Sequence, residues 1–349
     1  MTQHEIISFL TSGAIIRMPS GKVRLWKGPF ELSDTKKNQV FSVAYMNFYD
    51  SHLRSLLSAS PVIETEVSTL RSLLQSHLSE APLSASSFLP PSFEKFQESF
   101  QTIQGKIHRG EIEKAVPVVF AQSPLVPSPA QRARMIHQAL EAHADLYVFG
   151  FWNETEGVLG ATPEVLFQIN QKQLKTMALA GTSSRSEDKS LLRDPKELKE
   201  HQIVVKDIKE RLEKLGWVKL GETHVAEYGT LSHLRTLIEA EISDSSIEDL
   251  VKRLHPTAAL GVFPRNYGLT WMEKLPYQDQ RGLFGAPIVF SLSRSESIAL
   301  VAIRCLQWSE NGSQIGTGCG LVESSNLQKE WQELALKRES VIKALGLSL

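Results

Sequence analysis

Two acidic side chains and one basic side chain share a face of the helix expected near the end of the chain. Glu330, Glu333 and Lys337 are spaced three and four residues apart, so a helix over 326–345 places them together. This spacing is most often a solvent-exposed ion pair. Just upstream, however, three of the seven residues of GTGCGLV (316–322) are glycines, which lets a ligand approach the backbone and its amides bind a carboxylate. The helix face is therefore a candidate binding surface.

Other charged residues stand where burial would demand a partner. Glu164, in GATPEVLF, leads into an apolar strand, and a buried carboxylate needs a partner or a proton. Arg304 lies within an apolar strand and demands an anion. Glu200, next to His201, falls in a charged helix and is typical of a solvated face. Lys114 stands where GEIEKAVPVVF turns from polar to apolar, although lysines often flank strands harmlessly.

Several function classes are excluded. With 38 Lys and Arg against 39 Asp and Glu, the net charge is −1, so the chain lacks the excess of basic residues that a dedicated nucleic-acid-binding protein carries. No Cys/His spacing fits zinc, no nucleophile elbow or P-loop is present, and the three glycines of 316–320 follow G-x-G-x-G, which is not the dinucleotide-binding fingerprint. Cys305 and Cys319 cannot form a disulfide framework, and no secretion signal or membrane-length apolar run is visible. A cytoplasmic enzyme is expected, with no membrane attachment.

Strands joined by short connections dominate the elements that position these residues. Strands are predicted at 13–17, 22–27 and 39–47, then a helical stretch in SHLRSLLS and VSTLRSLLQSHL. Further helices are expected over 93–108, from the Ser128-Pro129 step, over 194–216 and over 326–345. AVPVVFA, LYVFGFW, IVFSLS, SIALVAIRCLQW and SQIGTGCGLV read as strands, the last two joined at Asn311-Gly312. We expect an α+β fold of largely antiparallel sheets with helices outside.

Nine blocks in order resemble the chorismate-utilising enzymes, which include isochorismate, salicylate, anthranilate and aminodeoxychorismate synthases. They are IHRGEIEKAV, GATPEVLF, MALAGTSSR, DPKELKEH, YGTLSHL, LHPTAALGVFPR, RGLFGAPIV, ALVAIRC and GTGCGLVESSNLQKEWQELALK. The resemblance implies the fold of that family and a chorismate-binding catalytic region at 91–349. Residues 1–90 carry no motif and are expected to supply strands and helices of the same unit.

The resemblance also implies roles for individual residues. Lys114 falls on the lysine that activates the attacking water, Glu164 on the general acid, and His233 near the departing hydroxyl. Magnesium would be held by Glu200 and Glu333, with Glu330 on the same side. The substrate would be bound by Gly181, Thr182, Ala259, Arg304, Gly318 and Lys337.

Lys114 and the LHPTAAL block resemble isochorismate synthases most closely, although KAVPV, Ala258 and Val262 depart from the usual pattern. The expected enzyme is an isomerase that converts chorismate to isochorismate by adding water at C2 and losing the C4 hydroxyl. Alternatives are salicylate synthase, component I of anthranilate or aminodeoxychorismate synthase, and a non-catalytic binding protein. No glutaminase partner is expected, and a monomer is favoured. The product would enter menaquinone, siderophore or salicylate biosynthesis.

The proposed roles impose a charge balance. A chorismate dianion, Mg²⁺, Glu200 with Glu333, and Arg304 with Lys337 compensate one another. Lys114 and Glu164 must then both start neutral, which requires burial to lower the pKa of the amine and raise that of the acid. We expect the two to face each other across the substrate. If Glu330 also binds as an anion, a neighbouring cation must compensate. Carboxylate ligands favour Mg²⁺ over zinc.

Overall fold

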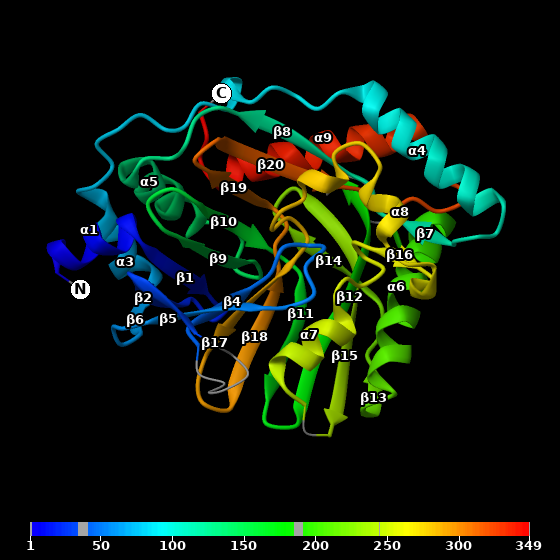
Figure 1. Ribbon diagram of the computed structural model, residues 1–349, viewed down its shortest axis with the longest axis horizontal. Coiled ribbons are helices and arrows are strands. Elements are labelled where there is room, and N and C mark those ends of the chain that lie inside the picture. The colour runs from blue at the N-terminus through cyan, green and yellow to red at the C-terminus, as the bar shows by residue number, and fades with distance from the viewer. Residues whose placement is uncertain (1, 34–40, 185–190, 244, 349) are drawn as a thin grey trace.

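Two large antiparallel sheets face each other, and helices cover their outer sides (Figure 1). The computed structural model describes residues 2–33, 41–184, 191–243 and 245–348. Within these ranges every pair of named neighbouring strands is antiparallel, as expected. The two sheets place apolar side chains against each other, with Phe149 and Phe151 from one and Phe290 and Leu300 from the other. The sequence expectation of an α+β fold is confirmed.

The first sheet has the strand order β6-β2-β1-β9-β10-β19-β20-β8. In that order its strands are Ile63–Glu66, Lys22–Lys27, Gly13–Arg17, Tyr147–Trp152, Gly157–Thr162, Cys305–Ser309, Gly312–Gly318 and Val118–Ser123. Strands from the first 66 residues thus continue a sheet whose other strands come from residues 118–318.

The second sheet has the order β13-β15-β12-β11-β18-β17-β4-β5-β3, and β14 also pairs with β15. In that order these are Gly216–Leu220, Leu231–Ile242, Gln173–Ser184, Val165–Asn170, Glu296–Val301, Pro287–Ser291, Val43–Tyr45, Arg54–Ser58 and Phe30–Ser33, with β14 at His224–Tyr228. A small third sheet pairs β7 (Lys114–Ala115) with β16 (Val262–Phe263).

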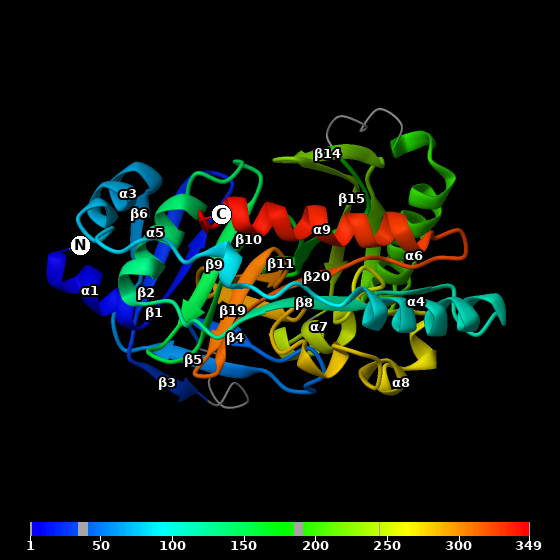
Figure 2. The same cartoon turned by 90° about the horizontal axis from the view of Figure 1, so that it is seen from above.

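Helices pack on both sheets. In the described residues the helices are α1 (Gln3–Thr11), α3 (Val67–Gln75), α4 (Phe93–His108), α5 (Pro129–Ala139), α6 (Pro195–Leu212), α7 (Ile247–Leu254), α8 (Thr270–Glu273) and α9 (Leu327–Ala344), with 3₁₀ turns at Ala85–Ser87, Arg265–Tyr267 and Gln278–Gln280. Helix α9 lies along β10 and β20, α6 covers β12 and β15, and α1, α3 and α5 pack together. Figure 2 shows the N-terminal end of α9 beside α6. None of the described helices is long and apolar enough to cross a bilayer.

Three sequence predictions were wrong. AVPVVFA, predicted as one strand, is divided between β7 of the small sheet and β8 of the first sheet. SHLRSLLS, predicted as helix, contains strand β5, because its backbone pairs with β3 and β4 from other parts of the chain. SIALVAIRCLQW, predicted as one strand, is two: β18 belongs to the second sheet and β19 to the first. The chain crosses between the sheets at 302–304, and Arg304 adopts a left-handed backbone with φ of 54°. Helix α1 was not predicted.

Candidate active site

Helices α6 and α9 bring four glutamates together. Asp194 caps α6 by accepting hydrogen bonds from the amides of Lys196 and Glu197. Glu197 and Glu200 then lie three residues apart on the buried face of the helix. The other two glutamates, Glu330 and Glu333, have the same spacing on α9. The helical periodicity places the two glutamates of each helix on one face of that helix. The packing of α6 against α9 then brings the two acidic faces together.

Lys196 lies in the middle of this group. Its Nζ is 2.9 Å from Glu197 Oε1, 3.4 Å from Glu200 Oε2 and 3.1 Å from Glu330 Oε1. Burial alone would favour the neutral amine, but the surrounding carboxylates outweigh it and raise the pKa of Lys196 above its ordinary value. The acidic cluster therefore already holds a cation, supplied by the chain itself.

The four carboxyl groups divide into two kinds. Burial raises the pKa of Glu197 and of Glu330 to about 7, and the neighbouring carboxylates add to this effect. Burial acts in the same sense on Glu200 and Glu333, but nearby lysine charges outweigh it and bring both pKa values below 4.5. Near neutral pH, Glu200 and Glu333 are thus the permanent anions of the cluster.

Lys114 lies beneath Glu200 and is fully buried. Its Nζ donates a 2.7 Å hydrogen bond to the carbonyl of Ala258 and is 3.2 Å from Glu200 Oε1. The chain passes close by at Gly320, where a Cβ would lie 2.0 Å from Glu200 Oε1 and 2.6 Å from Lys114 Cε. Glycine at this position thus makes room for the lysine and the glutamate rather than for a ligand.

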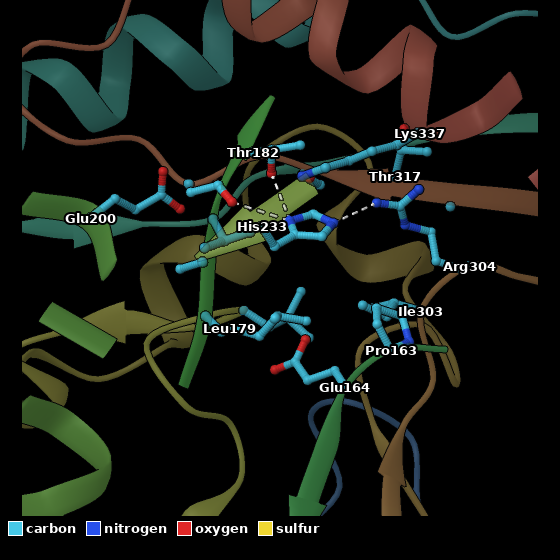
Figure 3. Close-up of a pocket in the computed structure, with 18 of the residues that line it drawn as sticks. Pro163, Glu164, Leu179, Thr182, Glu200, His233, Ile303, Arg304, Thr317 and Lys337 are labelled. Atoms are coloured by element: carbon cyan, nitrogen blue, oxygen red, sulfur yellow. Dashed lines mark hydrogen bonds between the residues drawn. The ribbon is translucent and has the colours of Figure 1, made fainter. Parts of the chain in front are cut away.

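His233 is held by neighbours on both sides (Figure 3). On β15 it pairs with Thr182 of β12, next to a β-bulge at Gly181, which has φ of 77°. Its Nδ1 lies 3.1 Å from the Gly181 carbonyl, which can only accept, so Nδ1 carries the proton. Nε2 then accepts from Arg304 Nη2 at 3.3 Å. Burial, followed by the charges of Arg304 and Lys337, lowers the pKa of His233 well below its ordinary value, so the ring is neutral.

Two cations face the cavity from the α9 side. Lys337 Nζ donates to the carbonyl of Gly318 at 2.9 Å and pairs with Glu333. Arg304 donates to Ser340 as well as to His233. Both acceptors of Arg304 are neutral, so its charge is available to bind an anion, whereas the charge of Lys337 is shared with Glu333.

Glu164 stands at the turn between β10 and β11 and is 5% exposed. Burial raises its pKa to about 7, against the opposing charges of Lys114 and Lys337. In Figure 3 it projects from a different wall of the cavity from Glu200. Since Lys114 contacts Glu200, the amine also lies on that other side. Glu164 is therefore a carboxyl group that can carry a proton near neutral pH.

A cavity with about 60 Å³ of free space joins these groups. Glu164, Glu200 and His233 line it. So do all six residues predicted to bind the substrate, which are Gly181, Thr182, Ala259, Arg304, Gly318 and Lys337. Of the other predicted residues, Lys114 lies behind Glu200 and Gly320, while Glu330 and Glu333 belong to the cluster beside the cavity. Sequence reasoning missed Lys196 and Glu197. The Glu-x-x-Glu spacing of Glu197 and Glu200 was the signal that could have found Glu197.

Among the described residues, no group of three His, Cys, Asp or Glu is already arranged to hold a metal ion. The chemistry of the cluster nevertheless fits Mg²⁺. Its donors are carboxylate oxygens, which hard divalent cations prefer. Lys196 demonstrates that a cation is stabilised among them, and the buried Oε2 atom of Glu330 has no hydrogen-bond partner. Glu200, Glu330 and Glu333 are therefore able to serve as the ligands that the resemblance implied.

Comparison with known proteins places this geometry in a family. The family described as "Chorismate binding enzyme" matches residues 21–346. The chain is 32% identical to the salicylate biosynthesis isochorismate synthase of Pseudomonas aeruginosa over 215 residues, which cover 58% of this chain and 45% of the relative. It is 26% identical to anthranilate synthase component 1 of Acinetobacter calcoaceticus over 337 residues, covering 90% and 66%. The chain thus spans about half to two thirds of the length of these curated relatives.

A solved structure has the same fold. The menaquinone-specific isochorismate synthase MenF of Escherichia coli superposes with a TM-score of 0.79 over 99% of this chain and 91% of that one. The sequence identity is 19%.

Proposed function

The chain belongs to the chorismate-binding enzyme family, and we propose that it is an isochorismate synthase, an isomerase that exchanges the C4 hydroxyl of chorismate for one at C2. The observation that carries this proposal is a buried carboxyl group of raised pKa, Glu164, that lines the cavity, together with a buried amine, Lys114, behind the cavity-lining Glu200. Water addition with loss of hydroxide needs a base and an acid placed in this way. Relatives named isochorismate synthase, including that of Pseudomonas aeruginosa, support the choice.

Each residue then has a defined task. In this scheme Lys114 takes a proton from the water that attacks C2 once its amine has lost its own proton, and protonated Glu164 gives a proton to the hydroxyl leaving C4 as water. The total charge of the site stays constant, which suits a buried pocket. Arg304 and Lys337 bind the substrate carboxylates by exchanging their present contacts. Neutral His233 holds Arg304 in place and lies near the departing hydroxyl.

Magnesium is part of the proposal. Bound to Glu200 and Glu333, with Glu330 beside them, it would neutralise and orient the ring carboxylate of chorismate. The permanent charge of Glu200 and Glu333 makes them suitable ligands at neutral pH. Substrate and product are isomers of equal charge, so the reaction should be reversible.

The test is product analysis. Purified protein incubated with chorismate and Mg²⁺ should yield isochorismate, detected by chromatography, and isochorismate should yield chorismate in return. Salicylate with pyruvate would indicate a salicylate synthase instead, and an ammonia-dependent fluorescent product would indicate an anthranilate-type enzyme. Chorismate binding without any turnover would mean that the scaffold only binds. Whether the product enters menaquinone, siderophore or salicylate biosynthesis depends on the enzyme that consumes it.

A further inference from the structure

Lys196 occupies the place where the carboxylates of α6 and α9 converge. We propose that Lys196 is a built-in counter-cation that competes with the divalent ion: its ammonium group holds the cluster together when no metal is bound and must leave when one enters. This proposal rests on the proposed function only in taking the cluster as the metal site.

The distances indicate a cluster opened to the size of an ammonium ion. Three carboxylate oxygens surround Lys196 Nζ at 2.9, 3.4 and 3.1 Å. Magnesium binds oxygen at about 2.0–2.1 Å. The oxygens of Glu200 and Glu330 would therefore have to move inward by about 1 Å to bind a metal at this position. They cannot do so while Nζ lies between them.

Charge also forbids joint occupancy. An ammonium group and a divalent ion a few ångströms apart in a buried site repel strongly. The other cations of the site have their own partners: Lys114 contacts Glu200 and Ala258, and Lys337 contacts Glu333 and Gly318. Lys196 is thus the cation that lies among carboxylates proposed to hold the metal.

From its buried position, Lys196 can reach solvent with its side chain. It lies in the first turn of α6, and its side chain is 17% exposed, whereas that of Glu330 is 2% exposed. The flexible stem of lysine can swing Nζ into solvent without moving the helix. Without Lys196, the negative charges of these neighbouring glutamates would lie next to one another uncompensated. With it, they remain paired to an ammonium group until the divalent ion binds. The result is a metal affinity set by exchange of one cation for another.

The experiment measures metal binding in the absence of chorismate. Titration of Mn²⁺, followed by the electron paramagnetic resonance signal of the free ion, is compared for the parent, Lys196→Met and Lys199→Met. Lys199 is the matched control because it lies on the same helix and carries the same charge, but it is exposed and pairs with Glu113 outside the cluster. We expect Lys196→Met to bind Mn²⁺ at least about tenfold more tightly and Lys199→Met to match the parent. Equal or weaker binding by Lys196→Met would overturn the proposal.

A second measurement uses the unmodified protein and so does not depend on the folding of a variant. Reductive methylation with mass spectrometry reports the accessibility of each lysine. Adding Mn²⁺ should increase labelling of Lys196 by several-fold and leave Lys199 unchanged, because the displaced ammonium reaches solvent. Labelling of Lys196 that stays constant or falls would contradict the exchange.

These outcomes separate the two proposals. If the parent makes isochorismate but Lys196→Met gains no Mn²⁺ affinity, only the competition is wrong. If the affinity rises as expected but the parent forms no isochorismate, the competition stands and the proposed reaction is wrong. Absence of Mn²⁺ binding in both proteins would reject the metal site and the competition together.

Discussion

Replacing Glu164 by glutamine should alter both the stability and the activity of the protein, in a manner set by pH. Glu164 is 5% exposed, and burial moves its pKa from 4.5 to about 7. The difference of about 2.5 pH units corresponds to about 3 kcal/mol at 1.36 kcal/mol per unit. The unfolded chain ionises Glu164 from about pH 4.5, whereas the folded protein does so only near pH 7. The stability gained by keeping the acid protonated is thus fully present below pH 4.5 and is lost as the pH rises through 7.

The glutamine side chain has the same size and no charge, so the Glu164→Gln variant escapes this loss. Urea unfolding at pH 4.5 and at pH 8.5 should show the free energy of unfolding of the parent falling by about 3 kcal/mol relative to the variant. Other buried acids titrate in both proteins and cancel in the comparison. The same variant should form isochorismate about 10² to 10⁴ times more slowly, because an amide cannot supply the proton.

The matched control is Glu241→Gln, on the exposed surface of β15, which should track the parent at both pH values. If the stability difference between parent and Glu164→Gln were the same at pH 4.5 and pH 8.5, Glu164 would not be a buried acid of raised pKa. If that variant turned over at the parental rate, another group would be the acid.

Three further substitutions test other parts of the site, and a fourth, in α4, serves as the control for Gly320→Ala. Lys114→Met should lower isochorismate formation at least about a hundredfold with unchanged circular dichroism, and retained turnover would assign water activation to another group. Gly320→Ala should reduce both turnover and Mn²⁺ affinity, because its Cβ collides with Glu200 and Lys114. Gly105→Ala in α4, where a Cβ meets only the end of a flexible side chain, should instead stabilise the protein by about 0.5–1 kcal/mol in urea unfolding. Glu333→Gln should abolish most of the Mg²⁺ dependence in steady-state assays, and a parental Mg²⁺ response would place the cation elsewhere.

Local patterns predicted the elements that depend on a few neighbouring residues. The strands at 13–17 and 22–27 were predicted with the bounds that the structure has, because short apolar runs bounded by turn residues indicate them within a short window. Prediction failed for SHLRSLLS because its leucines fit a helical period, while pairing with β3 and β4 decides its conformation. Arg304 was predicted inside a strand because nothing in its neighbours marks a crossing between sheets.

The sequence alone determined the family, the order of its motifs and the charged faces of single helices, because these depend on residue identity and short-range spacing. Glu330, Glu333 and Lys337 share a face in any helix of that register. The tertiary structure decided which faces meet: it brought α6 against α9, buried Lys114 under Glu200, and set Lys196 among three carboxylates. Contacts between segments so distant in the chain depend on packing of whole sheets and helices, and no local pattern encodes them.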